Sequence, residues 1–136
     1  MRVLSVTAQK PCSTGSGVYL TEVVRSLAKM GVSQAVVAGV TREDRVDMPE
    51  GVTVYPVYFS SEKLPYPVVG MSDDMPYTST RYRDMTEEMA GQFKAAFLEV
   101  LDEAIEKENP DIILCHHLYY LTALIRAHYP DRKSTR

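Results

Sequence analysis

The amino-acid sequence predicts an α/β fold in which a parallel sheet carries helices on both faces. Short apolar runs alternate along the chain with segments whose apolar residues recur at helical spacing. The apolar runs are continuous, which is typical of strands buried on both faces. The chain of 136 residues suits one domain of ordinary size. Together these observations predict a single Rossmann-like domain.

The first half of the chain supplies three predicted strands and one helix. Residues 2–7, 33–40 and 52–59 are apolar runs of strand length. Pro56 indicates that the third strand lies at an edge of the sheet, because proline has no N–H group for a neighbouring strand. The helix is predicted between the first two strands. Its apolar residues recur at helical spacing at Leu20, Val23, Val24 and Leu27, and Gly31 ends the pattern.

The second half supplies a long helix, a fourth strand and a short final helix. Thr86 offers an N-cap for the long helix, and Asn109 with Pro110 ends it. The fourth strand is predicted at residues 111–115. Helical spacing resumes from Leu121.

Residues 60–85 form a long segment without a steady hydrophobic period. Its tyrosines and apolar residues argue against disorder, so we expect an ordered, irregular excursion from the sheet. Within it, Tyr77 and Arg81 are candidates for binding a polar acceptor molecule or a partner surface. The alternative is a surface flap that closes over its own apolar residues.

The predicted strand order is 3-2-1-4, which is half of a doubly wound fold. In this order the first and fourth strands are neighbours, and the direction of the crossovers reverses between them. Ligands of such folds bind at the carboxyl ends of the strands at this point. The glycine-rich segment 7–20 and the run Cys115-His116-His117 leave these two strand ends, so we expect them to meet in one crevice.

The glycine-rich segment fails the tests for two common phosphate-binding motifs. A P-loop requires Lys and Ser or Thr after its last glycine, whereas Val18 and Tyr19 follow Gly17. A dinucleotide fingerprint requires a third glycine, where Leu20 stands. It also requires an acidic residue at the end of the second strand, and "VVAGV" ends without one. Two interpretations of Gly15-Ser16-Gly17 remain. They bring the backbone and free helix N–H groups to a ligand, or they form a tight strand-to-helix connection.

The adjacent His116 and His117 are the candidate catalytic residues. An imidazole at the crevice can hydrogen-bond a sugar hydroxyl or act as a base, and the alternative is a pair that caps the final helix. Cys12 and Cys115 do not complete a recognised zinc pattern with them, so no metal site is predicted.

Composition excludes several classes of function. The net charge of −3 and the pI near 5.6 argue against a dedicated nucleic-acid binder. No apolar run approaches the length of a membrane span, roughly 20 residues. The N-terminus is typical of a strand rather than a signal peptide. Two cysteines cannot form a disulfide framework, which predicts a reducing, cytoplasmic setting.

Several segments together resemble the N-terminal half of a group 1 (family 4) glycosyltransferase. They are "MRVLSVT", "STGSGVYLTEVVRSLAKMG", "AVVAGV" and "NPDIILCHHLYYLTALIRAHYP", in this order and spacing. The loop "LPYPVVGMSDDMPYTSTRYRDMTEEM" is similar to a segment of one bacterial subgroup. The resemblance assigns residues 1–130 to a Rossmann-like acceptor-side domain with a long irregular loop at 60–85. Residues 131–136 would be a polar tail.

The resemblance implies half of a GT-B architecture, in which two Rossmann-like domains face a cleft. The N-terminal domain binds an acceptor sugar or glycan, and the C-terminal domain binds a nucleotide-sugar donor. Transfer retains the anomeric configuration and needs no cofactor or bound metal. At the matching positions, Gly15-Ser16-Gly17 would lie beside the donor diphosphate, and His116 or His117 near the reacting carbon.

The departures from the family also carry expectations. The pair of glutamates eight positions apart that marks the donor domain is missing, and the chain stops where the family would begin another strand. We therefore expect a truncated domain that lacks its donor partner and is inactive alone. Exposed interface surface would favour self-association, and the full-length enzyme would associate peripherally with membranes. The alternative is a stand-alone Rossmann-like ligand-binding or assembly module without catalysis. A nucleotide hydrolase ranks last.

Overall fold

A computed structural model shows a five-stranded parallel sheet in the order β3-β2-β1-β6-β7. It describes residues 1–8, 15–44, 46, 48–62, 64–70, 80–81, 84–116, 120–129 and 133–135. The elements are β1 (Arg2–Thr7), α1 (Gly15–Lys29), β2 (Ser33–Val40), β3 (Thr53–Tyr58), β4 (Val69–Gly70), β5 (Thr80–Arg81), α2 (Glu87–Glu108), β6 (Ile112–Cys115), α3 (Tyr120–His128) and β7 (Lys133–Thr135). The Rossmann-like α/β fold and the predicted order of the first four sheet strands are confirmed.

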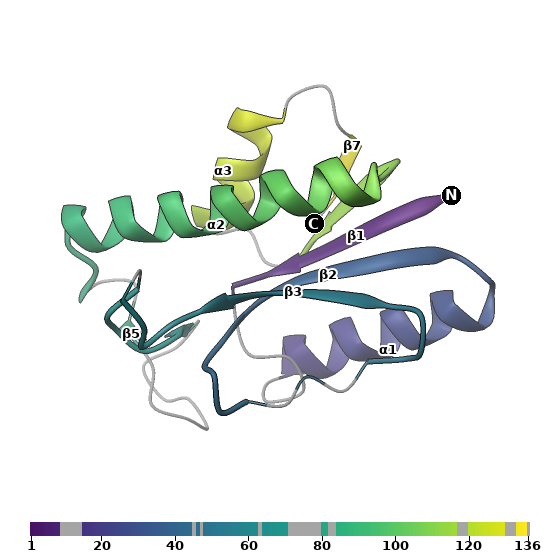
Figure 1. Cartoon of the computed structure of the whole chain (residues 1–136), viewed down its shortest axis with the longest axis horizontal. Helices are drawn as coiled ribbons and strands as arrows, with labels where there is room; N and C mark the ends of the chain where they lie inside the picture. The colour runs from purple at the N-terminus through teal and green to yellow at the C-terminus, as the bar shows by residue number, and fades with distance from the viewer. Residues whose placement is uncertain are drawn as a thin grey trace.

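The sheet lies between two layers of helices (Figure 1). The helix α1 covers one face, whereas α2 and α3 cover the other. β1 is at the centre and pairs in parallel with β2 on one side and with β6 on the other. The edge position of β3, which Pro56 predicted, is confirmed.

The two faces of the sheet are packed with side chains of different size. The face under α2 and α3 holds the larger core, in which Phe59 contacts the ring pair of Phe93 and Phe97. The face under α1 carries a smaller cluster of aliphatic residues. Gln34 is buried on this face, and its Nε2 donates a hydrogen bond to the carbonyl oxygen of Val24 in α1 at 2.8 Å.

The ends of α2 agree with the predicted signals. The Oγ1 atom of Thr86 accepts a hydrogen bond from the N–H group of Met89 at 3.2 Å, which confirms the N-cap. Asn109 adopts a left-handed conformation with φ of 43°, and its N–H group donates to Ile105. Asparagine tolerates this conformation better than most residues, so the helix ends there.

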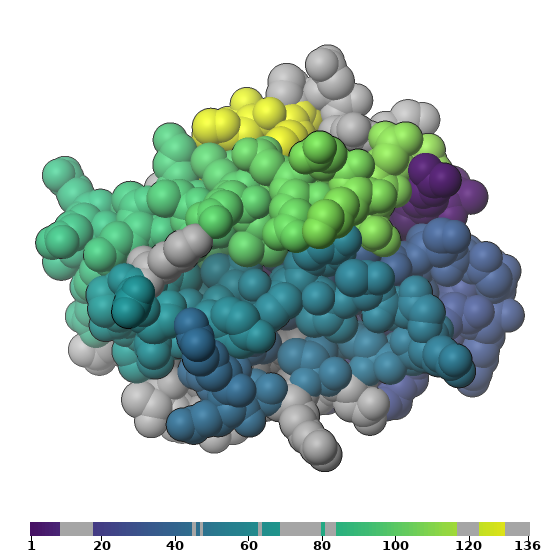
Figure 2. All heavy atoms as spheres, in the orientation of Figure 1, coloured from purple at the N-terminus to yellow at the C-terminus, as the bar shows by residue number. Residues whose placement is uncertain are grey.

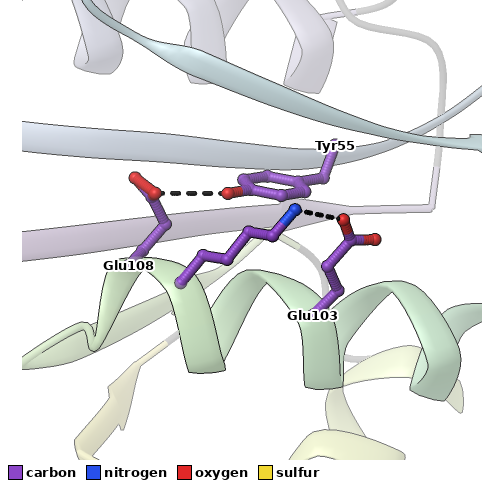
Figure 3. Close-up of polar contacts among 4 residues, drawn as sticks. Tyr55, Glu103 and Glu108 are labelled. Atoms are coloured by element: carbon purple, nitrogen blue, oxygen red, sulfur yellow. Dashed lines mark hydrogen bonds and ion pairs between the residues drawn. The ribbon is translucent and has the colours of Figure 1, made fainter.

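Tyrosine hydroxyl groups tie three other parts of the fold to α2. Tyr55 on β3 donates to Glu108 Oε2 at 3.2 Å, and Figure 3 shows its ring between the sheet and the helix. Tyr66 donates to the carbonyl oxygen of Met89 at 2.8 Å. Tyr129, after α3, donates to Asp102.

In the space-filling view, α2 forms a continuous ridge above β3 (Figure 2).

Two elements differ from the sequence-based expectation. The helix α1 already begins at Gly15, so Gly15–Gly17 form its first turn rather than a preceding loop. The first N–H groups of a helix have no hydrogen-bond acceptor within the helix. Glycine is therefore tolerated better in this turn than in the helix interior, where it is unfavourable. Residues 133–135, predicted as part of a polar tail, form β7 and pair with β6. An edge strand tolerates polar and charged residues, so its sequence lacks the apolar signature of a central strand.

The described part of the predicted excursion packs against the larger core. Leu64, Tyr66 and Val68 are buried in it. The short strands β4 and β5 pair in parallel, and Thr80 Oγ1 donates to the carbonyl oxygen of Pro67 at 2.7 Å. The described residues of the excursion are therefore fixed by apolar packing against the core and by short main-chain pairing, although they contain no long helix or strand.

Gly39 provides a test of the packing around the carboxyl end of β1. A Cβ atom on Gly39 would lie 2.4 Å from the carbonyl oxygen of Ala8 and 2.9 Å from Cε1 of Phe59. We expect Gly39→Ala to lower the free energy of unfolding by about 1–3 kcal/mol, because the backbone of Ala8 must shift. Urea-induced unfolding measures this change.

Gly91→Ala is the matched control. Gly91 lies in α2, and nothing lies within 4 Å of an added Cβ atom. Alanine there should raise the stability by about 0.5–1 kcal/mol, because it favours the helix. Unchanged stability of Gly39→Ala, beside a stabilised Gly91→Ala, would contradict the close approach of Ala8.

Candidate functional site

The carboxyl ends of β1 and β6 meet at the centre of one edge of the sheet. Val6 pairs with Cys115, and the N–H group of His116 donates to the carbonyl oxygen of Val6 at 3.0 Å. This hydrogen bond holds His116 directly at the end of β6. The sheet therefore brings the end of its first strand beside a residue more than a hundred positions later, as the strand order predicted.

The beginning of α1 lies against the same point. The ring centroids of Tyr19 and His116 are 6.1 Å apart, and the rings meet edge to face at an interplanar angle of 62°. Tyr19 is 64% exposed, whereas the next residue, Leu20, is fully buried against the sheet. The predicted meeting of the glycine-rich segment with the end of the fourth strand is thus realised through Tyr19.

His116 is partly buried, and its Nε2 atom is shielded from solvent. A ligand in this arrangement would have to contact the imidazole elsewhere on the ring. Cys115, the preceding residue, is buried in the larger core on the other face of the sheet. Successive side chains of a strand point to opposite faces, so the end of β6 directs His116 toward the side of α1.

The first turn of α1 supplies backbone donors at this edge. The N–H groups of the first turn have no acceptor within the helix, and they lie at the positive end of its dipole. No acidic side chain occupies this turn. An anionic or hydroxyl-bearing ligand is the partner that such groups favour. A ligand role for the backbone of Gly15–Gly17 stays a prediction.

The remaining predicted site residues are not brought to this edge by any described contact. Arg81 is in β5, paired beside β4, and its side chain lies outside the description. His117 and Tyr77 lie outside the described residues, and their predicted roles stay predictions.

The turn after β2 contains an acidic residue, Asp44, beyond the last strand residue, Val40. Asp44 Oδ2 accepts hydrogen bonds from the N–H group of Thr41 at 2.7 Å and from its Oγ1 atom at 3.0 Å. In dinucleotide-binding folds an acidic residue near this strand end binds the ribose. Here the carboxylate turns back onto its own loop, which argues against a nicotinamide dinucleotide.

The described part of the chain holds neither a candidate metal centre nor a membrane-spanning helix. Within the described ranges, no group of three or more His, Cys, Asp or Glu side chains is placed to hold a metal ion. No helix in those ranges is both long and apolar enough to cross a bilayer. One groove of about 260 Å³ lies between β3 and α2 and is lined in part by Arg42, Tyr58 and Val100.

No protein-family model matches the sequence, and no curated protein matches it. The fold and the edge geometry therefore define the class of the protein, which is a Rossmann-like α/β domain. Its candidate site lies at the switch point between β1 and β6.

Tyr19 is the site residue that sequence reasoning missed. In the sequence, Tyr19 is informative only as one of the two residues after Gly17 that rule out a P-loop. One signal was present: Tyr19 stands outside the apolar stripe that begins at Leu20, in a helix that starts at the predicted crevice. Single exposed apolar residues are ordinary on protein surfaces, so it is the ring contact with His116, and not exposure alone, that makes Tyr19 a candidate.

Tyr129 gives a pH-dependent test of the support for α3, the helix that follows this strand end. Burial, followed by the hydrogen bond with Asp102 and the charge of that carboxylate, raises the pKa of the Tyr129 phenol above its ordinary value of 10.0. The folded chain therefore keeps a proton that the unfolded chain releases. We expect the contribution of Tyr129 to the free energy of unfolding to be fully present below about pH 10. It should decrease as the pH rises further.

Tyr129→Phe should flatten this fall and lower stability at neutral pH by about 0.5–1.5 kcal/mol, because the hydrogen bond is lost. Urea unfolding at a series of pH values measures both effects. Tyr58→Phe, in which the substituted ring is 40% exposed on β3, is the control. Identical pH dependence of Tyr129→Phe and the wild type would contradict the assignment.

Proposed function

We propose that the chain is the acceptor-binding domain of a retaining glycosyltransferase that moves a sugar from a nucleotide-sugar donor to an acceptor hydroxyl. The observation that carries the proposal is the contact of Tyr19 with His116 at the switch point. It joins the beginning of α1 to the end of β6, where α/β folds bind their ligands.

The chemistry of the edge suits both parts of such a reaction. As the bond between the sugar and the diphosphate breaks, negative charge grows on the diphosphate. The N–H groups at the beginning of α1 are donors of the kind that stabilise this charge. An imidazole at the same edge is suited to hydrogen-bond hydroxyl groups. The resemblance of the sequence to a group 1 transferase supports the same pairing of groups.

The proposal assigns most of the donor site to a second domain facing this edge. That domain would supply the spaced glutamates that these residues do not contain. We place the enzyme in the cytoplasm, where the buried thiol of Cys115 would stay reduced. The alternative, a ligand-binding module without catalysis, uses the same edge, and the experiment below separates the two.

Titration of the isotope-labelled chain, followed by NMR, tests the proposal. We expect nucleotide-sugars or methyl pyranosides to shift the amide signals of residues 6–8, 15–20 and 116. His116→Ala should weaken this binding about tenfold, which is the size expected for a lost hydrogen bond to a ligand. His128→Ala, at the exposed end of α3, is the matched control and should bind as the wild type does.

Release of the nucleoside diphosphate by the complete gene product, in the presence of acceptor, tests catalysis. His116→Ala should reduce the rate about a hundredfold or more, because positioned general acid–base groups have effects of this size. Ligand shifts that cluster away from the carboxyl edge, or no response to any donor or pyranoside, would contradict the proposal. Binding at this edge without any transfer would favour the module.

A further inference from the structure

Tyr19 presents an aromatic ring to solvent at the point where the proposed ligands meet. It is 64% exposed and follows Val18, which is 50% exposed, whereas Leu20 and Val24 on the same helix are fully buried. The helix is therefore anchored by other residues, and the Tyr19 ring contributes little to that anchoring. Its position cannot be explained by the core.

The contact with His116 orients this ring without covering it. In an edge-to-face pair, one ring offers its edge and the other its face. If Tyr19 offers its edge, His116 covers neither of its faces. If Tyr19 offers one face, His116 leaves the other uncovered. In both arrangements an aromatic face remains available, in agreement with the high exposure of the residue.

We propose that the Tyr19 ring, braced by His116, is the platform on which one pyranose ring of the acceptor stacks. The face of an aromatic ring is electron-rich, and the C–H groups on one face of a pyranose carry partial positive charge, so the two surfaces attract each other. A single exposed tyrosine ring also matches the area of a single sugar ring. This inference rests on the proposed function and adds the acceptor contact to it.

The surroundings of Tyr19 favour a sugar over a wholly apolar partner. The ring carries its own hydroxyl group and contacts the partly buried imidazole of His116, and the N–H groups at the start of α1 lie about one helical turn earlier in the chain. A pyranose combines an apolar face with a rim of hydroxyl groups, so it can use both kinds of contact. Aromatic residues with one wet and one apolar side commonly serve such mixed interfaces.

The chain contains no tryptophan, which allows a direct test. In Tyr19→Trp the new indole is the only one, and its fluorescence reports what covers it. The probes are the methyl pyranosides of glucose, galactose, mannose and N-acetylglucosamine, and sorbitol, which has comparable hydroxyl groups but no ring. We expect a saturable blue shift with at least one pyranoside and none with sorbitol.

Met30→Trp is the matched control, because Met30 is 75% exposed and directly follows α1, at the opposite end of this helix from the switch point. Its emission should not respond to the pyranosides. A response of both indoles, or an equal response to pyranoside and sorbitol, would overturn the platform. So would the lack of any response at position 19. A blue shift that grows with protein concentration alone would identify a contact between copies instead and would also overturn it.

Two further variants separate stacking from hydrogen bonding. By NMR titration with the pyranoside that binds, Tyr19→Phe should bind within about twofold of the wild type, and Tyr19→Leu should bind about fivefold to tenfold more weakly. Circular dichroism and urea unfolding should show the wild-type fold in both, because the ring is exposed. Equal binding of Tyr19→Leu and the wild type would overturn the inference.

The platform and the proposed function can fail separately. If nucleotide-sugars bind at the carboxyl edge and transfer occurs, but the Tyr19→Trp indole ignores every pyranoside, the platform is wrong and the transferase stands. If the indole responds to a pyranoside while the complete gene product releases no nucleoside diphosphate from any donor, the platform stands and the transferase is wrong.

Discussion

The pairing of β1 on both of its edges is the constraint on which the rest of this structure depends. β1 lies between β2 and β6, and all of its residues after Arg2 are buried. Main-chain groups in such a place must be hydrogen-bonded within the protein. β6 therefore has to return beside β1 after a long intervening stretch of chain. The hydrogen bond from His116 to Val6 ends this pairing and places the imidazole at the edge.

The two layers of helices have different tasks. The layer with α2 supplies the large aromatic core, and the hydroxyl groups of Tyr55, Tyr66 and Tyr129 attach β3, the excursion and the end of α3 to it. The layer with α1 is held by smaller residues and by the buried amide of Gln34. The layer with α2 thus supplies the larger core, and the layer with α1 carries the candidate site. This arrangement is common in proteins, where a rigid scaffold positions groups at the ends of its elements.

In the proposed function, the edge combines two kinds of recognition within a short distance. The beginning of α1 offers N–H groups suited to a diphosphate, and one turn later the same helix presents Tyr19 beside His116. For transfer, the diphosphate of the donor and the accepting hydroxyl group must both lie close to the carbon atom of the donor sugar at which the bond is exchanged. One helix terminus placed against one strand end would organise both molecules.

The sequence by itself determined the elements whose signals are local. The extents of β1 and β2, the N-cap at Thr86 and the helix end at Asn109 follow from apolar runs and from capping chemistry. The order of the first four strands followed as well, because few topologies satisfy an alternating βα pattern. Only the tertiary structure decided the rest. β7 has a polar sequence and exists because β6 offers it a free edge. The contact of Tyr19 with His116 joins residues with no local relation, so it depends on the pairing of β6 with β1 and on the packing of α1.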